Sequence, residues 1–560
     1  MPSWLLTLTV FLPLVGTLAL YALPRPAWRW VAVGTSALTL ALAIADAVAF
    51  DWRHGGALQL TQRVPWIPSI GASYYLAVDG LSLPLILLTA LLTFVALLYS
   101  WKQEQRPREF FALFLVMEVG LLGFFSALDL LLFYFFFEIS LVPMYFIIGG
   151  WGHERRREAA LKFFLYTRVG SLAMLLSILT LYLAVNPHTF SLPAIIAAQP
   201  FPGAGAIPSL ILLGFFIGFA IKLPIVPLHS WLPDAHTEAP TAGSVLLAGA
   251  LLKMGGYGFL RLALPTVPGA FSAWAAPIAA LAVISAIYGA AVAMGQRDLK
   301  RLVAFSSVNH MGYVLLGVAV AAVAGANPAD RLAGATGATY QMVAHGLVTG
   351  GLFLLVGMLS DRTRTREIAR LSGLWNALPQ WGALLIFMMF ASLGLPALAQ
   401  FAAEVQILLG ALGVFAWAAV GMLVAIIITT AMFLWTLQRI LLGKTPPEWS
   451  KLQPLSRREL VVMAPLVVLI VVLGVVPGPL TGVIEGALRG AIIGPLHLIP
   501  ATYAPGALDA IARLHALPIL RALPLPHAVV HAVVHAVAIL RTHTAQGLAA
   551  LARFTPPESW

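Results

Sequence analysis

The sequence predicts an all-α polytopic membrane protein with about fourteen transmembrane helices. Of its 560 residues, 60% are hydrophobic and only 10% are charged, and the mean hydropathy of +0.92 lies far above that of a soluble domain. Apolar stretches of about 20 residues recur along the whole chain, and each is long enough to cross a bilayer as a helix. The lipid bilayer is therefore an expected partner, and no stretch is left for a separate soluble domain.

The candidate spans begin at the first residues. The opening segment MPSWLLTLTVFLPLVGTLALYALP has an apolar run too long for a signal peptide and no small-residue cleavage site, so we expect it to be retained as the first span. The predicted spans are 3–22, 28–48, 78–100, 110–127, 129–150, 158–184, 208–228, 241–263, 272–294, 301–322, 333–357, 382–410, 413–440 and 460–480.

Basic residues cluster in alternate connections between these spans. The clusters contain Arg25, Arg29, Lys102, Arg106, Arg108, Arg155, Arg156, Arg157, Arg297, Lys300, Arg301, Arg362, Arg364, Arg366, Arg370, Lys444, Lys451, Arg457 and Arg458. The intervening connections hold little beyond Arg53, Arg63, Arg261 and Arg331. The positive-inside rule makes the first set cytoplasmic and both termini external. The net charge of +11 therefore indicates membrane topology, and no nucleic-acid partner is expected.

Prolines interrupt two of the spans beside a charged residue. In GFAIKLPIVPLHSWLPDAH, Pro224 and Pro227 follow Lys222, and in LGLPALAQFAAEVQIL, Pro396 precedes Glu404 by eight residues. Proline removes a backbone donor and kinks a helix. Broken helices in two halves of a chain are typical of transporters with an ion path at the breaks. The simpler interpretation is that proline is common in membrane helices.

Four ionisable residues lie inside apolar spans: Glu138, Lys222, Lys253 and Glu404. A charge at the bilayer centre costs roughly 2.5–3.5 kcal/mol on insertion scales, which makes each a candidate functional residue. We expect an ion pair of Glu138 with Lys222 whose breaking lowers the proton affinity of the lysine. Lys253 then receives the proton through water, and Glu404 passes it toward the opposite face. The alternative is a static ion pair that holds two helices in register.

Three histidines are further candidates for the proton path. His310 and His345 fall within apolar spans, where they could carry protons between Lys253 and Glu404, and His229 ends the first broken span. Each is equally well explained as a hydrogen-bonded packing residue. A third possibility is a redox enzyme in which His310 and His345 ligate haem or contact quinone.

Other polar residues admit simpler explanations. Glu118 and Arg168 lie in apolar surroundings and could pair with each other or with lipid headgroups, and Asp79 is predicted to cap a helix N-terminus.

In the segment 484–560, we predict amphipathic helices on a membrane or partner surface. Its polar stripe of His527, His531 and His535 has a spacing that could also bind a metal, but no acidic or cysteine partner is near, so no metal site is predicted.

Cysteine is absent from the chain. This excludes thiolate-bound iron–sulfur clusters, haem attached through cysteine, disulfides and redox-active thiols. We therefore expect no cofactor in this chain and no catalytic redox residue, so any electron transfer occurs elsewhere.

Several long motifs resemble one known family. They are KLPIVPLHSWLPDAHTEAPTAGSVLLAGALLKMGGYGFLR, WIPSIGASYYLAVDGLSLPL, FFFEISLVPMYFIIGGWGH and QRDLKRLVAFSSVNHMGYVLLG. The run of motifs is similar to the antiporter-like, proton-translocating membrane subunits of respiratory complex I (NADH:quinone oxidoreductase), specifically the NuoM type. The sister subunits have a lysine in the twelfth helix, whereas the NuoM type has a glutamate, as at Glu404. The likeness covers roughly residues 1–480.

The resemblance implies a fourteen-helix core with two inverted five-helix repeats and broken seventh and twelfth helices, and a proton path through Glu138, Lys222, Lys253 and Glu404. The implied divisions are three N-terminal helices in 1–108, the two repeats in 109–263 and 264–440, the last transmembrane helix in 441–483 and a C-terminal amphipathic tail in 484–560.

The resemblance also implies partners and a location. FMN, iron–sulfur clusters and quinone are expected in partner subunits, and the chain is expected among the other membrane subunits of complex I, including sister antiporter-like subunits, in the bacterial inner (plasma) membrane. The rival functions are a subunit of a multi-subunit sodium/proton antiporter and a structural membrane scaffold.

Overall fold

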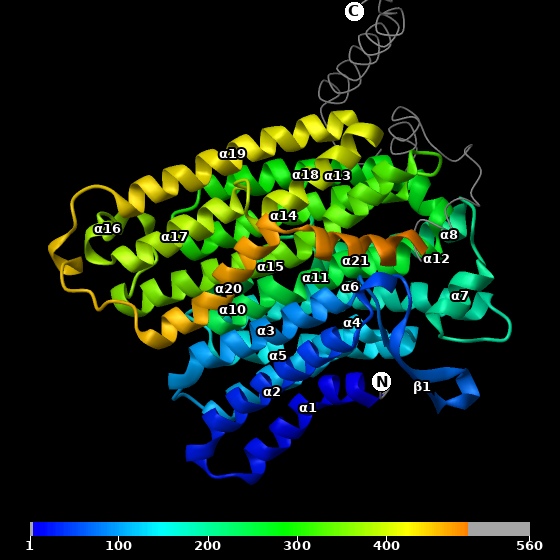
Figure 1. Cartoon of the computed structure of the whole chain (residues 1–560), viewed down its shortest axis with the longest axis horizontal. Helices are drawn as coiled ribbons and strands as arrows, with labels where there is room; N and C mark the ends of the chain where they lie inside the picture. Colours follow the sequence, from blue (N-terminus) through cyan, green and yellow to red (C-terminus); the bar gives the residue numbers. More distant parts are fainter. Residues whose placement is uncertain (1–3, 491–560) are drawn as a thin grey trace, which may run out of the picture. The chain divides into compact units, whose positions relative to one another are not determined.

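The computed structural model describes residues 4–490, and most of these residues are helical (Figure 1). Twelve helices in this part of the chain are long and apolar enough to cross a membrane, which confirms a multi-pass helical membrane protein. The main helices are α1 (Trp4–Ala22), α2 (Trp28–Ala49), α3 (Leu83–Tyr99), α4 (Pro107–Ser126), α5 (Leu130–Trp151), α6 (Arg156–Ala184), α8 (Ala206–Lys222), α13 (Pro268–Met294), α14 (Leu299–Ala322), α15 (Pro328–Thr363), α17 (Pro379–Ser392), α18 (Ala399–Val414), α19 (Ala416–Leu441) and α20 (Arg457–Val475).

The seventh and twelfth spans are interrupted as predicted. The seventh span forms α8 and a non-helical stretch, and the short helix α9 (Trp231–Glu238) follows it. The twelfth span forms α17 and α18, separated by 393–398. Pro224, Pro227 and Pro396 all lie in the interruptions, where the missing backbone donor of proline breaks no helical hydrogen bond. The inverted five-helix repeats and the proposed domain limits stay predictions.

The eighth span is a continuous run from Thr241 to Thr266 whose winding changes along its length. It consists of α10 (Thr241–Leu246), a π-helical turn at Leu247–Leu251, α11 (Lys253–Gly258), a second π-helical turn at Phe259–Ala263 and α12 (Leu264–Thr266). A π-helical turn inside an α-helix frees backbone groups and often marks a functional site.

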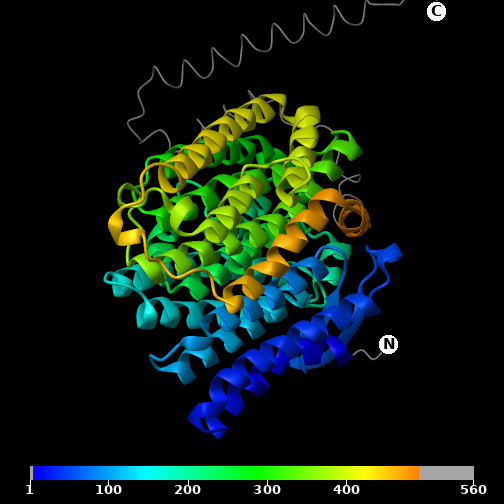
Figure 2. The ribbon, with the colours of Figure 1, turned by 60° about the vertical axis from the view of Figure 1, so that its left-hand side comes forward.

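The core consists of this eighth span together with α14 and α15, all three of which are buried in their apolar stretches. α14 and α15 pack side by side (Figure 1). Their backbones approach closely because Gly317 of α14 faces Gly334 of α15. A β-carbon on Gly317 would stand 2.3 Å from Gly334 O. By contrast, α2, α6 and α19 expose large apolar side chains such as Val48, Leu176 and Ile427. Figure 2 shows α1 and α2, in blue, along one edge of the bundle.

A β-hairpin between α2 and α3 was not predicted. β1 (Gln59–Ile67) pairs antiparallel with β2 (Ala72–Val78), with Val64 opposite Tyr74. The turn contains Gly71 at φ +66°, a backbone conformation that glycine adopts without strain. Shorter elements are α7 (Leu192–Ala198), α16 (Leu374–Ala377) and α21 (Gly478–Leu488). The predicted tail from 491 onward, with its three histidines, lies outside the described residues.

Candidate functional site

The first helix break places Lys222 inside the protein without a hydrogen-bond partner. Lys222 is the last residue of α8, and α9 begins only at Trp231. The lysine is 1% exposed, and its Nζ has no partner among the described residues. The ammonium lies 4.8 Å from the centre of the Phe137 ring and 5.8 Å from that of Phe163. Aromatic faces attract a cation but cannot accept its proton, so a water molecule would be a suitable hydrogen-bond partner for this ammonium.

The predicted ion pair of Glu138 with Lys222 is not formed. Glu138 Oε2 accepts a hydrogen bond from Arg168 Nη1 of α6 at 2.7 Å. Phe137 faces Lys222, and the next residue of an α-helix points about 100° away, which turns Glu138 toward α6. Of the two options for Glu118 and Arg168, pairing with each other does not occur: Glu118 is fully buried, and neither of its carboxylate oxygens has a partner among the described residues.

Lys253 lies between the two π-helical turns of the eighth span. Its Nζ donates a hydrogen bond to Ala248 O, in the first π-helical turn, and lies 2.8 Å from His345 Nδ1 of α15. In that turn the N–H of Leu252 bonds Leu247 O, the wider π pattern that leaves the Ala248 carbonyl available to the ammonium. Lys253 and His345 are both 0% exposed, so the polar contact is closed off from bulk solvent.

His345 continues the polar contacts toward α14. The rings of His345 and His310 lie 5.6 Å apart, measured between their centres, and cross at 60°. His310 Nε2 lies 3.2 Å from Ser392 Oγ, at the end of α17. His345 Nε2, in contrast, has no hydrogen-bond partner among the described residues. A single water molecule would satisfy it and extend the chain of hydrogen bonds.

Glu404 lies at the second helix break and is reached from His310. His310 Nδ1 is 3.5 Å from Glu404 Oε1 and 2.8 Å from Gln400 Nε2. Gln400 Nε2 also donates to Glu404 Oε1 at 3.0 Å and to Ser392 O at 2.7 Å. Glu404 is 6% exposed. The predicted residues Lys253, His345, His310 and Glu404 therefore form one buried polar series across the eighth span, α15, α14 and α18.

The remaining predicted histidine lies apart from that series. The ring of His229 packs against Tyr288 at 5.1 Å, and His229 is 7% exposed. His236, which the sequence analysis overlooked, is 0% exposed and stacks on Phe353 of α15 with ring centres 4.5 Å apart. Neither ring nitrogen of His236 has a partner among the described residues. His236 lies in 229–240, between the predicted spans 208–228 and 241–263, where no apolar stretch indicated burial.

A second buried network lies at the other end of the eighth span. Asp79 Oδ1 accepts hydrogen bonds from the N–H groups of Leu81 and Ser82, which confirms its capping role before α3. It also forms an ion pair with Arg261 Nη2 at 2.5 Å, and Arg261 Nε donates to Tyr257 Oη at 3.1 Å. Arg261 was predicted to lie in an external connection, which is wrong because the eighth span extends to Thr266.

Arg331 was likewise assigned to an external connection. It belongs to the first turn of α15, is 2% exposed and donates from Nε to Ala321 O at 3.0 Å. No group of three or more His, Asp or Glu residues that could hold a metal ion occurs within 4–490.

Comparisons with known proteins identify the family. The profile described as "NADH:quinone oxidoreductase/Mrp antiporter, TM" matches residues 127–430. The chain is 39% identical to NADH-quinone oxidoreductase subunit M of Rhodobacter capsulatus over 483 residues, which cover 83% of this chain and 92% of the relative. It is 42% identical to the subunit M of Escherichia coli K12 over 466 residues, covering 79% and 88% of the two chains.

Solved structures agree with this assignment. A chain of respiratory complex I from Thermus thermophilus with bound NADH matches with a TM-score of 0.77 and 33% identity, covering 90% of this chain and 100% of that chain. A chain of the Mrp complex from Dietzia shares the fold, with a TM-score of 0.72 and 22% identity over 88% of this chain and 100% of that chain. The protein therefore belongs to the antiporter-like membrane subunits of NADH-quinone oxidoreductase, the NuoM type of complex I subunit.

Proposed function

We propose that this chain translocates protons across the bacterial inner membrane along the series Lys253, His345, His310 and Glu404. The observation that carries the proposal is the contact of Lys253 Nζ with His345 Nδ1 at 2.8 Å, since a proton moves only between groups joined by a hydrogen bond or by water. Ionisable side chains in the interior of a membrane protein are costly, so four of them in one series favour a functional role such as transport.

Each transfer in the series has a donor and an acceptor. Lys253 gives its proton to His345 Nδ1, and His345 releases the proton on Nε2 toward His310 through water. His310 Nδ1 faces Glu404 Oε1 at 3.5 Å, and Gln400 touches both side chains. Histidine suits these two positions because it can accept a proton on one ring nitrogen and release one from the other.

Lys222 supplies protons to Lys253 in this proposal, and Glu138 controls that supply. Since Glu138 bonds Arg168, the control is an exchange of Glu138 between Arg168 and Lys222, in place of a permanent pair. A nearby carboxylate favours the charged lysine, and its loss favours release of the proton. Water molecules link Lys222 to Lys253, and the unpaired Nζ of Lys222 and the unpaired nitrogens of His236 are polar groups to which such water would bind.

Energy for transport comes from other subunits of the complex. Moving one charge against 100 mV requires roughly 2.3 kcal/mol. In this proposal FMN, iron–sulfur clusters and quinone reside in partner subunits, quinone reduction there drives the exchange at Glu138, and sister antiporter-like subunits contact this chain in the membrane.

The test is NADH-driven proton uptake by inverted membrane vesicles that contain the assembled complex. We expect Lys253→Met and Glu404→Gln to lower the protons taken up per NADH oxidised at matched complex content. Lys451→Met is the control, because Lys451 lies exposed in a connection outside the path. Normal uptake in both path variants would refute the proposal, and uptake that requires sodium would favour the sodium/proton antiporter.

A further inference from the structure

The short helix α9 is an element whose position must be set by its neighbours. It has eight residues and follows the non-helical stretch after Lys222, and helices shorter than about 12 residues are marginally stable on their own. It carries the buried His236, and only two residues separate it from Thr241, which begins the span that contains Lys253. Any rotation of α9 would therefore move His236 and the segments that lead to Lys222 and to Lys253.

Three consecutive carbonyls at the C-terminal end of α9 each receive a hydrogen bond from a different element. Thr237 O accepts from Arg366 Nη1 at 2.8 Å, Glu238 O from the backbone N–H of His153 at 3.0 Å, and Ala239 O from Lys300 Nζ at 2.5 Å. The last carbonyls of a helix lack partners within the helix and carry partial negative charge, so cations stabilise them.

The N-terminal half of α9 is held by cations as well. Asp234 lies in its first turn and accepts hydrogen bonds from Lys162 Nζ of α6 at 2.7 Å and from Arg301 Nη1 of α14 at 3.1 Å. Lys162, Lys300, Arg301 and Arg366 are named here the α9 clamp. All four are cations that bond α9 from outside, and they come from α6, α14 and the connection after α15.

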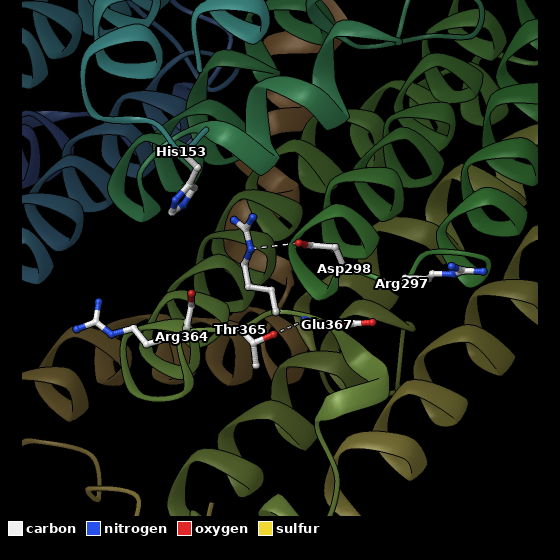
Figure 3. Close-up of a pocket in the computed structure, with 8 residues that line it drawn as sticks. His153, Arg297, Asp298, Arg364, Thr365 and Glu367 are labelled. Carbon is white, nitrogen blue, oxygen red and sulfur yellow. Dashed lines mark hydrogen bonds and ion pairs between the residues drawn. The ribbon is translucent and has the colours of Figure 1, made fainter. Parts of the chain in front are cut away.

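Arg366 joins the clamp to a cytoplasmic pocket of about 390 Å³. In Figure 3, His153, Asp298 and Thr365 line this pocket from three separate segments of the chain. Arg366 Nε forms an ion pair with Asp298 at 3.1 Å, and Asp298 caps α14 by accepting from the N–H of Arg301 at 3.0 Å. The same cations thus tie α9 to the start of α14, the helix that carries His310.

We infer that the α9 clamp positions His236 and the end of the first helix break for proton transfer, so that its cations are positioning residues. Positive-inside anchoring alone does not explain them, because an anchor faces lipid headgroups, whereas Lys300 is 3% exposed and its ammonium bonds a single carbonyl of α9. Once α9 is held, His236 stacks on Phe353, and its carbonyl accepts a hydrogen bond from Ser244 Oγ of the eighth span. This inference rests on the proposed proton path.

The test compares variants of the assembled complex in inverted vesicles by two measurements. These are protons taken up per NADH oxidised, and deuterium uptake by peptides that cover α9. We expect Lys300→Met and Arg366→Gln to lower the proton yield and to speed exchange in α9 by about tenfold, the effect of losing one charge-assisted hydrogen bond. Lys300→Arg keeps the donor and should restore both quantities.

The matched control is Arg370→Gln, which removes a cation from the same connection. Arg370 is 54% exposed in its side chain and lies 3.8 Å from Glu448, so neither measurement should change. If Lys300→Met and Arg366→Gln speed deuterium exchange in α9 but leave the proton yield unchanged, the clamp only stabilises α9 and the inference is overturned. Unchanged deuterium exchange in these two variants would overturn it as well. If Lys300→Met does not assemble, Asp234→Asn tests the other end of α9 by the same readouts. Lys253→Met separates the two proposals, since normal uptake in that variant refutes the path itself.

Discussion

Gly394 lies directly against Glu404 at the second helix break. A β-carbon on Gly394 would stand 2.6 Å from Glu404 Oε2, and Gly394 has φ +77°. We predict that Gly394→Ala displaces the carboxylate from His310 and lowers proton uptake per NADH by about tenfold to a hundredfold. The reason is that a misplacement of reacting groups by about 1 Å can lower the rate of transfer between them by up to about a hundredfold. Vesicle proton uptake measures the effect.

The control for this variant is Gly443→Ala. Gly443 has a similar backbone conformation, with φ +92°, and nothing lies within 4 Å of the site of its β-carbon. Backbone strain is therefore present in both variants, and only Gly394→Ala crowds Glu404. Equal losses in the two variants would attribute the effect to strain alone.

The buried pair of Asp79 and Arg261 is predicted to stabilise the end of the eighth span. The side chains are 2% and 7% exposed. Removing one partner leaves an uncompensated buried charge and costs about 3–5 kcal/mol. Arg261→Met and Asp79→Asn should each lower the thermal unfolding temperature of the purified complex, and the double variant should recover part of the loss. A double variant that is as unstable as the sum of the single ones would mean that the two residues do not act as a pair.

The pair of Glu138 and Arg168 is predicted to regulate transport more than stability. Its side chains are 19% and 44% exposed, and pairs this exposed contribute at most about 1 kcal/mol. We expect both Arg168→Leu and Glu138→Gln to lower NADH-driven proton uptake at matched complex content, because the first variant leaves Glu138 with Lys222 as its only cation and the second removes the carboxylate charge. Normal uptake in Arg168→Leu would exclude an exchange of partners at Glu138.

His153 is predicted to stay neutral in mildly acidic solution. Desolvation, followed by the positive charges of Lys300 and Arg366, lowers the pKa of His153 to about 4. As the pH falls from 7.5 to 5.5, an ordinary histidine with a pKa of about 6.5 becomes mostly protonated, whereas His153 does not. At pH 5.5 diethylpyrocarbonate, which modifies neutral imidazole, should therefore react about ten times faster with His153 in the folded chain than in the urea-unfolded chain. Mass spectrometry of the modified peptide measures this ratio, and a ratio near one would contradict the prediction.

Local sequence features were sufficient for the fold class and for much of the site. Apolar length predicted the membrane helices, since a span is set by the thickness of the bilayer. Pro224, Pro227 and Pro396 predicted the two breaks because proline lacks a backbone donor, and their position near Lys222 and Glu404 distinguished them from Pro277 and Pro465, which lie inside continuous helices. Lys253 and Glu404 stood out as charges in apolar surroundings for the same local reason, and the role of these residues, His345 and His310 in proton transfer stays a prediction.

Only the tertiary structure decided which of these groups meet. Glu138 bonds Arg168 in place of Lys222 because the rotation of α5 about its axis turns the carboxylate toward α6. His236 is buried because α9 packs against α6 and α14 and the histidine ring stacks on Phe353 of α15. Arg261 lies in the second π-helical turn of the eighth span and reaches Asp79 from there. Helix rotation, register and the partners of a short helix depend on contacts between segments far apart in the chain. The periodicity of one segment does not specify which distant side chains it will contact, so tertiary packing alone determined the pairs of Glu138 with Arg168 and of Asp79 with Arg261.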